Sequence, residues 1–179
     1  MRSTVITALG LALATAACGS PTATPTAAAS PSAPDKPAFA VEGPAVIAAI
    51  QALGAPWNAA KTSDPMVDAR TAGTVRVLNG AAGSAQVFSR SNGQVWHVKL
   101  VTGAANTCGA SQPLLDALPT MAALLKPGTT VSDADRDLVN DGLIATRRTT
   151  IDTPAMAITT QGGCTHWLTL AVPNDAAAA

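Results

Sequence analysis

The amino-acid sequence predicts an α+β domain in which an antiparallel sheet of hairpins is covered on one face by helices. Three observations support this fold class. Residues 44–54 and 113–126 carry large apolar side chains at helical spacing. Residues 74–101 alternate between apolar and polar types in three runs separated by Asn-Gly pairs, which are strong hairpin signals. Residues 149–172 alternate in the same way around a pair of glycines.

The first helix is expected between Pro44 and Gly54. Proline suits a first turn because its missing N–H would be unpaired there, and glycine suits a C-terminal stop. The large apolar residues of this segment recur at helical intervals: Val46, Ile47, Ile50 and Leu53. Residues 58–71 are polar and irregular, so no regular element is expected there.

A meander of three antiparallel strands is expected next. Asn and Gly both tolerate the positive φ that a type I′ turn requires, so the Asn-Gly pairs mark its two reversals. Alternation within the last run places Trp96 toward the core and His97 toward solvent. The expected strands are residues 74–78, 85–89 and 94–101.

Two helices open the second half of the domain. Residues 113–126 form the longer one, which would kink at Pro119. Ser132, with Asp135 three residues later, resembles a capping box and begins a shorter helix. Arg147 and Arg148 follow that helix and suit the negative charge of its C-terminal end better than an anionic ligand.

The last elements expected are two strands, residues 149–160 and 165–172, with Pro154 at an edge or bulge. Each half of the domain then consists of a helix and a hairpin whose final strand carries a tryptophan, Trp96 or Trp167. This allows a tandem α-β-β arrangement. The alternative is that any two hairpins with a tryptophan look similar.

Composition narrows the function classes. The chain of 179 residues has 11 basic and 11 acidic side chains, so no net charge attracts nucleic acid. Three Trp, two Phe and no Tyr are too few for broad stacking platforms. GxSxG and SxxK motifs are absent from the sequence, and Glu42 is its one glutamate. We expect no nucleic-acid partner and no cofactor, and we keep a small envelope hydrolase using Asp and His as the alternative function.

The N-terminal residues resemble the export signal of bacterial lipoproteins. Residues 5–14 form a ten-residue apolar stretch after Arg2. In a helix this stretch spans about 15 Å, half of a membrane's hydrocarbon core, which is typical of a signal peptide. The following TAACGS run resembles the lipobox of that family, although Thr15 stands where the family prefers Leu. The resemblance implies a signal peptide at residues 1–17 and lipidation of Cys18, which becomes the new N-terminus.

The expected location is therefore the extracytoplasmic side of the cell membrane, with ordinary secretion after cleavage near Ala17 as the alternative. Residues 19–38 contain five prolines among Ser, Thr and Ala, and cannot bury enough apolar surface to fold. Such a tether reaches about 25 Å if flexible and about 60 Å if extended. The expected organisation is a signal peptide (1–17), lipidated Cys18 and tether (18–38), one α+β domain (39–174) and a disordered tail (175–179).

Three short segments carry a second resemblance. Residues 53–56 (LGAP), 87–88 (VF) and 92–95 (NGQV) are similar to those of helix-plus-meander domains in outer-membrane-assembly lipoproteins and secreted β-lactamase-inhibitor proteins. Such domains act by protein contact, so the resemblance implies a non-catalytic binding module. We expect another envelope protein as its partner, and contact with the membrane through the lipid anchor only.

Cys108 and Cys164 remain after Cys18 is assigned to the lipid. An even number of cysteines in an exported chain predicts a disulfide between them. Neither has a ligand-type spacing, so a metal-binding or nucleophilic thiol is the lesser alternative. His97 and His166 would form two ligands of a metal site if the two halves paired, but a third His or Cys ligand is lacking, and no metal site is expected.

Trp167 carries the binding hypothesis. It alternates with the apolar Leu168, and would lie on the outer face of its hairpin with His166 or Thr169 nearby. We expect this group of residues to mark the contact surface. Burial in the core is the alternative, because so few aromatic residues are available to fill it.

Overall fold

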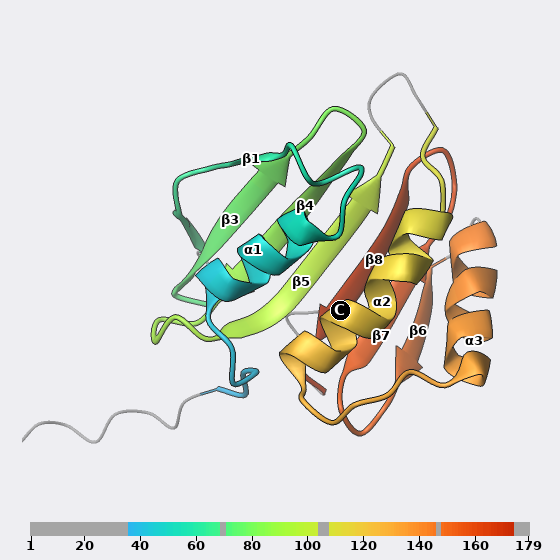
Figure 1. The fold of residues 1–179 in the computed structure, drawn as a ribbon. Helices are drawn as coiled ribbons and strands as arrows, with labels where there is room; N and C mark the ends of the chain where they lie inside the picture. The colour runs from blue at the N-terminus through green and yellow to red at the C-terminus, as the bar shows by residue number, and fades with distance from the viewer. Residues whose placement is uncertain (1–35, 69–70, 104–107, 146–147, 174–179) are drawn as a thin grey trace, which may run out of the picture. The chain divides into compact units, whose positions relative to one another are not determined.

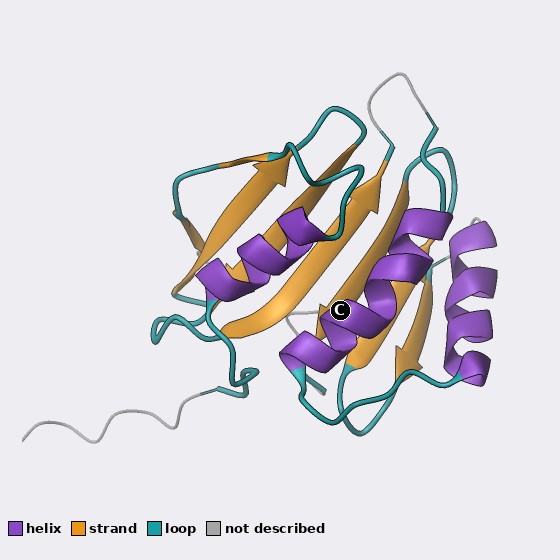
Figure 2. Ribbon diagram, in the orientation of Figure 1, coloured by secondary structure: helices purple, strands orange, loops and turns teal. Residues whose placement is uncertain are grey.

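A computed structural model describes residues 36–68, 71–103, 108–145 and 148–173. Within these residues three helices pack on one face of an eight-stranded antiparallel sheet, which confirms the predicted α+β class (Figures 1 and 2). The helices are α1 (Gly43–Ala52), α2 (Gln112–Leu125) and α3 (Asp133–Ile144). The strands are β1 (Lys61–Thr62), β2 (Met66–Asp68), β3 (Gly73–Asn79), β4 (Gly83–Ser89), β5 (Val95–Thr102), β6 (Thr149–Asp152), β7 (Ala157–Gln161) and β8 (His166–Ala171).

Four predictions concern residues outside the described ranges and stay predictions. They are the signal peptide at residues 1–17, the lipidated Cys18, all but the end of the tether, and the tail at 175–179. Within the described ranges, no helix is both long and apolar enough to span a bilayer.

The sheet joins two three-stranded meanders through their last strands. Its order is β1-β3-β4-β5-β8-β7-β6, and β2 also pairs with β3. β5 runs antiparallel to β8, with Lys99 opposite Thr169. The pairing is symmetric about this point, because His97 lies opposite Ala171 and Val101 lies opposite Trp167. The two meanders are therefore related by an approximate twofold axis that passes between Lys99 and Thr169.

The second half holds one strand more than the sequence predicts. The single strand expected over residues 149–160 is wrong, because the chain reverses there between β6 and β7. Thr153 closes the reversal: its Oγ1 donates to Met156 O (2.8 Å) and accepts from Met156 N (3.0 Å). Pro154 lies in this turn. The second half thus contains two helices and a three-stranded meander, where the sequence suggested helices and a hairpin.

The first half follows its prediction more closely. The two reversals at Asn79-Gly80 and Asn92-Gly93 occur, but in loops longer than two residues: Gly80 N donates to Gly83 O (2.9 Å) and Arg90 N to Gln94 O (2.8 Å). β1 and β2 fall inside the segment expected to be irregular. They are two and three residues long and mostly exposed, so they show no periodicity that a sequence pattern could reveal.

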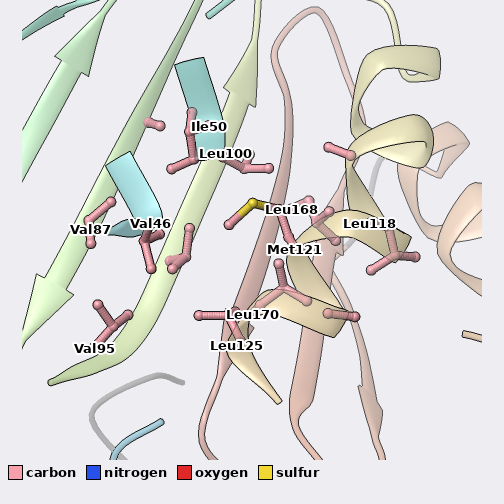
Figure 3. Packing of buried hydrophobic residues seen from close by; sticks show 14 of the residues in the cluster. Val46, Ile50, Val87, Val95, Leu100, Leu118, Met121, Leu125, Leu168 and Leu170 are labelled. Atoms are coloured by element: carbon pink, nitrogen blue, oxygen red, sulfur yellow. The ribbon is translucent and has the colours of Figure 1, made fainter. Parts of the chain in front are cut away.

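The core lies between the helices and the face of the sheet that they cover. Figure 3 shows Leu100 and Leu168 of neighbouring strands pointing into the same space as Met121 of α2. Trp57 and Trp96 are the two largest fully buried side chains, and Trp57 Nε1 donates to Ser84 O (3.0 Å). Pro119 lies on the exposed side of α2, and the helix continues through it.

α3 packs closely against the second meander. The predicted capping box is confirmed: Ser132 Oγ accepts from Asp135 N (3.1 Å), and Asp135 Oδ2 accepts from Ser132 N (3.3 Å). Gly142 permits the close approach, because a Cβ there would lie 2.1 Å from Thr160 Oγ1 of β7. The absence of a side chain at this position therefore sets how near α3 lies to the sheet.

The predicted disulfide between Cys108 and Cys164 is present. It closes a sequence separation of 56 residues and ties the segment before α2 to the turn between β7 and β8. On loop-closure entropy alone such a link stabilises the folded state by about 4 kcal/mol.

Candidate functional site

The sheet has one face covered by helices and one open face. Because side chains alternate along each strand, the neighbours of the core residues Val98, Leu100, Leu168 and Leu170 point away from the helices. Figure 1 shows α1, α2 and α3 all on the same side of the sheet. The central side chains of the open face are Gln86, Phe88, His97, Lys99, Val101, Thr159, Gln161, Trp167, Thr169 and Ala171.

Trp167 lies on this open face with a cation on either side of its strand. Lys99 of β5 places its Nζ 4.9 Å from the centroid of the indole. The guanidinium carbon of Arg148, directly before β6, lies 5.8 Å from the same centroid. β5 and β6 are on opposite sides of β8 in the sheet, so the two cations reach the indole from opposite directions. Such contacts each contribute about 0.5–1 kcal/mol at exposed positions.

Hydrogen-bonding side chains continue from Trp167 toward β6. Gln161 lies directly opposite Trp167 on β7. One row of the sheet is formed by three threonines, in which Thr150 and Thr159 share a hydrogen bond (3.1 Å) and Thr169 Oγ1 donates to Thr159 O (3.4 Å). This side of the open face is thus an indole with two cations beside a row of hydroxyl and amide side chains, with Asp152 two residues beyond Thr150 on β6.

His97 is buried, so the prediction that it is solvated is wrong. Alternation places it correctly on the face away from the core, but its ring stacks on Phe88 of β4 with centroids 4.8 Å apart. Only 8% of its surface is exposed. Neighbouring rings, which a single strand's periodicity does not reveal, cover this part of the open face.

The structure brings Thr169 to the face of Trp167 and leaves His166 on the other one. Thr169 is two residues from Trp167 on the same strand, although only 6% of it is exposed. His166 points to the helix side, where its Nδ1 lies 2.9 Å from the carbonyl oxygen of Leu143 near the end of α3. The expected contact surface therefore loses His166 and gains Lys99 and Arg148.

The two histidines do not approach each other. His97 lies on the open face and His166 on the helix side, at opposite ends of the β5–β8 pairing. The described residues contain no group of three His, Cys, Asp or Glu side chains that could hold a metal ion.

Three cavities lie away from the centre of the open face. The largest, about 510 Å³, lies between α2, the loop before α3 and the β6–β7 turn, and includes Asp135 and Asp152. Asp135 already serves the capping box of α3. A second of about 320 Å³ lies near Pro37 and Pro173, and a third of about 240 Å³ lies beside Cys108. Neither histidine lines any of these three cavities.

Sequence reasoning missed both cations of the site. Arg148 was expected to complement the end of α3, but the helix ends at Ile144 and Arg148 lies beside Trp167. The sequence does show that Arg148 directly precedes a predicted strand. It does not show that the side chain reaches Trp167 on β8, because that depends on the order of β6, β7 and β8 in the sheet.

No protein family, curated protein or solved structure matches this chain.

Proposed function

We propose that this protein is a non-catalytic binding module, held on the outer face of the cytoplasmic membrane by a lipid on Cys18, and that it contacts its partner through the open face around Trp167. The observation that carries the proposal is the placement of its three indoles. Trp57 and Trp96 are fully buried, whereas Trp167 is partly exposed on the face that the helices leave uncovered.

The residue types of this surface support the proposal. Tryptophan and arginine dominate binding energy at protein surfaces, because a large side chain contributes both apolar area and directed polar contacts. Trp167 has Arg148 beside it, and Lys99 on its other side. The surrounding Gln161 and threonine side chains supply hydrogen bonds at the rim.

The disulfide supports the proposed compartment. Disulfides persist in oxidising surroundings such as the cell envelope and are rare in the cytosol. The Cys108–Cys164 link is thus consistent with the export signal expected at residues 1–17.

The test is a pull-down of the tagged, lipidated protein from detergent-solubilised envelope. We expect Trp167→Ala to lose most of the captured partner while the thermal midpoint falls by only a few degrees. Leu138→Ala is the matched control, because Leu138 is an exposed apolar residue on α3, on the helix side of the sheet. Equal capture by Trp167→Ala and the unmodified protein, with a midpoint lower by many degrees, would show that Trp167 belongs to the core.

A further inference from the structure

We infer, as an extension of the binding function proposed above, that the open face docks onto the phosphate headgroups of anionic phospholipids through Lys99 and Arg148. The surface would then hold the domain against the membrane that carries its lipid anchor. This adds a second membrane contact to the anchor, where the sequence led us to expect the lipid alone.

Two positive charges lie near each other at the surface around Trp167. Lys99 and Arg148 lie on either side of one indole, which keeps two like charges near each other at the surface. Among the described residues, no carboxylate forms an ion pair with either of them. By contrast, the Arg136 guanidinium on the helix side lies 3.2 Å from the Asp116 carboxylate. The open face thus presents positive charge that an anionic ligand would neutralise.

The surface around Trp167 suits phosphate groups better than flat rings. Both cations lie over the ring of Trp167, so the indole serves to position them and does not offer a bare face for stacking a sugar or a base. Beside them, the Gln161 amide can donate hydrogen bonds to phosphate oxygens, and so can the exposed Thr150 hydroxyl where Thr159 is the donor in the bond that the two share. Headgroup phosphates are spread over a plane, so a broad sheet face can contact several of them. A single anion would be bound better in a pocket.

The expected lipid anchor keeps the domain close to the membrane. The tether expected over residues 19–38 reaches about 25 to 60 Å, so the membrane surface is always within range of the domain. A basic residue near an anionic bilayer strengthens association about five-fold, which is weak for a free protein. Tethering makes the second contact intramolecular, so a weak attraction suffices to orient the domain. Lys, Arg and Trp are also the side chains that occur at membrane interfaces.

The inference fixes an orientation. The open face would lie toward the lipid, and α1, α2 and α3 would face away from it (Figure 1). Lys126, at the end of α2, and Arg136 of α3 lie on the helix side and would be remote from the headgroups. Replacing these two cations therefore changes the net charge as much as replacing Lys99 and Arg148, and makes a matched control.

Quenching of tryptophan fluorescence by a labelled lipid reports on Trp167, because the other two tryptophans are buried. The full lipidated chain is reconstituted into vesicles that contain a lipid with a nitroxide label on its headgroup. One set is phosphatidylcholine, and the other holds equal parts of phosphatidylcholine and phosphatidylglycerol. We expect fluorescence quenching at least about two-fold greater in the anionic vesicles, given the five-fold effect of each cation. The excess should vanish in K99Q/R148Q and persist in K126Q/R136Q, with thermal midpoints of both variants near that of the unmodified chain.

Two results would overturn the inference. Equal quenching in the two vesicle types would show that the open face does not contact anionic headgroups. If Trp167→Ala still lost a captured protein in the pull-down, the face would bind a protein partner, and the proposed binding function would stand. A loss of the excess in both double variants would show a response to net charge alone, with no role for this surface.

Discussion

β5 and β8 carry the same two ring-bearing residues in opposite order. β5 has Trp96 followed by His97, and β8 has His166 followed by Trp167. The approximate twofold axis relates His97 to Trp167 and Trp96 to His166. A bulge interrupts the alternation of β5 at Trp96, because the pairing with β4 passes from His97 directly to Val95. The Trp96 ring lies 5.3 Å from the His97 ring and 5.8 Å from the Phe88 ring, so the three rings share one side of the sheet. A similar run of letters thus has different roles, since the Trp96 indole is fully buried and the Trp167 indole is partly exposed.

Both indoles have a cation over the ring, but the cations differ in what else they bind. The guanidinium carbon of Arg90 lies 4.4 Å from the centroid of Trp96, and Arg90 is buried with its Nε and Nη2 donating to the Pro37 carbonyl oxygen (3.3 and 3.1 Å). That cation fastens the start of the domain to the sheet. Lys99 and Arg148 have no such partner among the described residues. The contact between Arg90 and Trp96 is therefore structural, whereas the cations beside Trp167 are available for binding.

The largest effect is expected where the first indole is removed. Trp96 is completely buried and contacts Phe88 edge-on with centroids 5.8 Å apart. Trp96→Ala should reduce the free energy of unfolding by about 3–5 kcal/mol, since it leaves a large cavity. Chemical denaturation followed by circular dichroism measures this. A cost similar to that of Trp167→Ala would remove the distinction between the two indoles.

Loss of the disulfide should be the next largest effect. Cys108→Ser/Cys164→Ser frees a link that joins the segment after β5 to the turn before β8. We expect a loss of about 2–4 kcal/mol, because the unfolded chain regains the entropy of an open loop. Calorimetry of the double variant, beside the unmodified chain with and without reductant, gives the value. An unchanged midpoint under reduction would mean that the segment before α2 and the β7–β8 turn stay together without the link.

Gly142→Ala tests how closely α3 packs on the second meander. Helix propensity alone would make this change stabilising by about 1 kcal/mol. The new Cβ would meet Thr160 Oγ1, so we expect a net destabilisation of about 1–3 kcal/mol instead. Thermal denaturation distinguishes the signs. Gly142→Ala/Thr160→Ala, which makes room for the added methyl group, should recover part of the loss.

The smallest effect on stability is expected for Trp167→Ala. The indole is partly exposed, and its removal forfeits two surface cation contacts, each about 0.5–1 kcal/mol. We therefore expect a loss of about 1–2 kcal/mol, less than half of that for Trp96→Ala. The same denaturation series measures both variants. A loss above that of Trp96→Ala would place the second indole, and not the first, at the centre of the fold.

The sequence allowed most of the first meander to be predicted and less of the second. Long runs with clear alternation, such as residues 94–101, indicated both the strand and the faces of its side chains. The Thr-rich residues 149–160 favour β structure continuously, so the reversal at Pro154 was hidden within one apparent strand. The cations of the site could not be predicted, because Lys99 and Arg148 meet Trp167 only through the order and register of four strands.

The claim that the open face is the contact surface can be tested in living cells with a photo-crosslinking residue. p-Benzoylphenylalanine would replace Gln161, beside Trp167 on β7, in one strain and Ala134, exposed on α3, in another. On illumination we expect a covalent adduct, with lipid or protein, from position 161 and none above background from position 134. Adducts from position 134 alone would contradict it, and would move the contact surface to the helices.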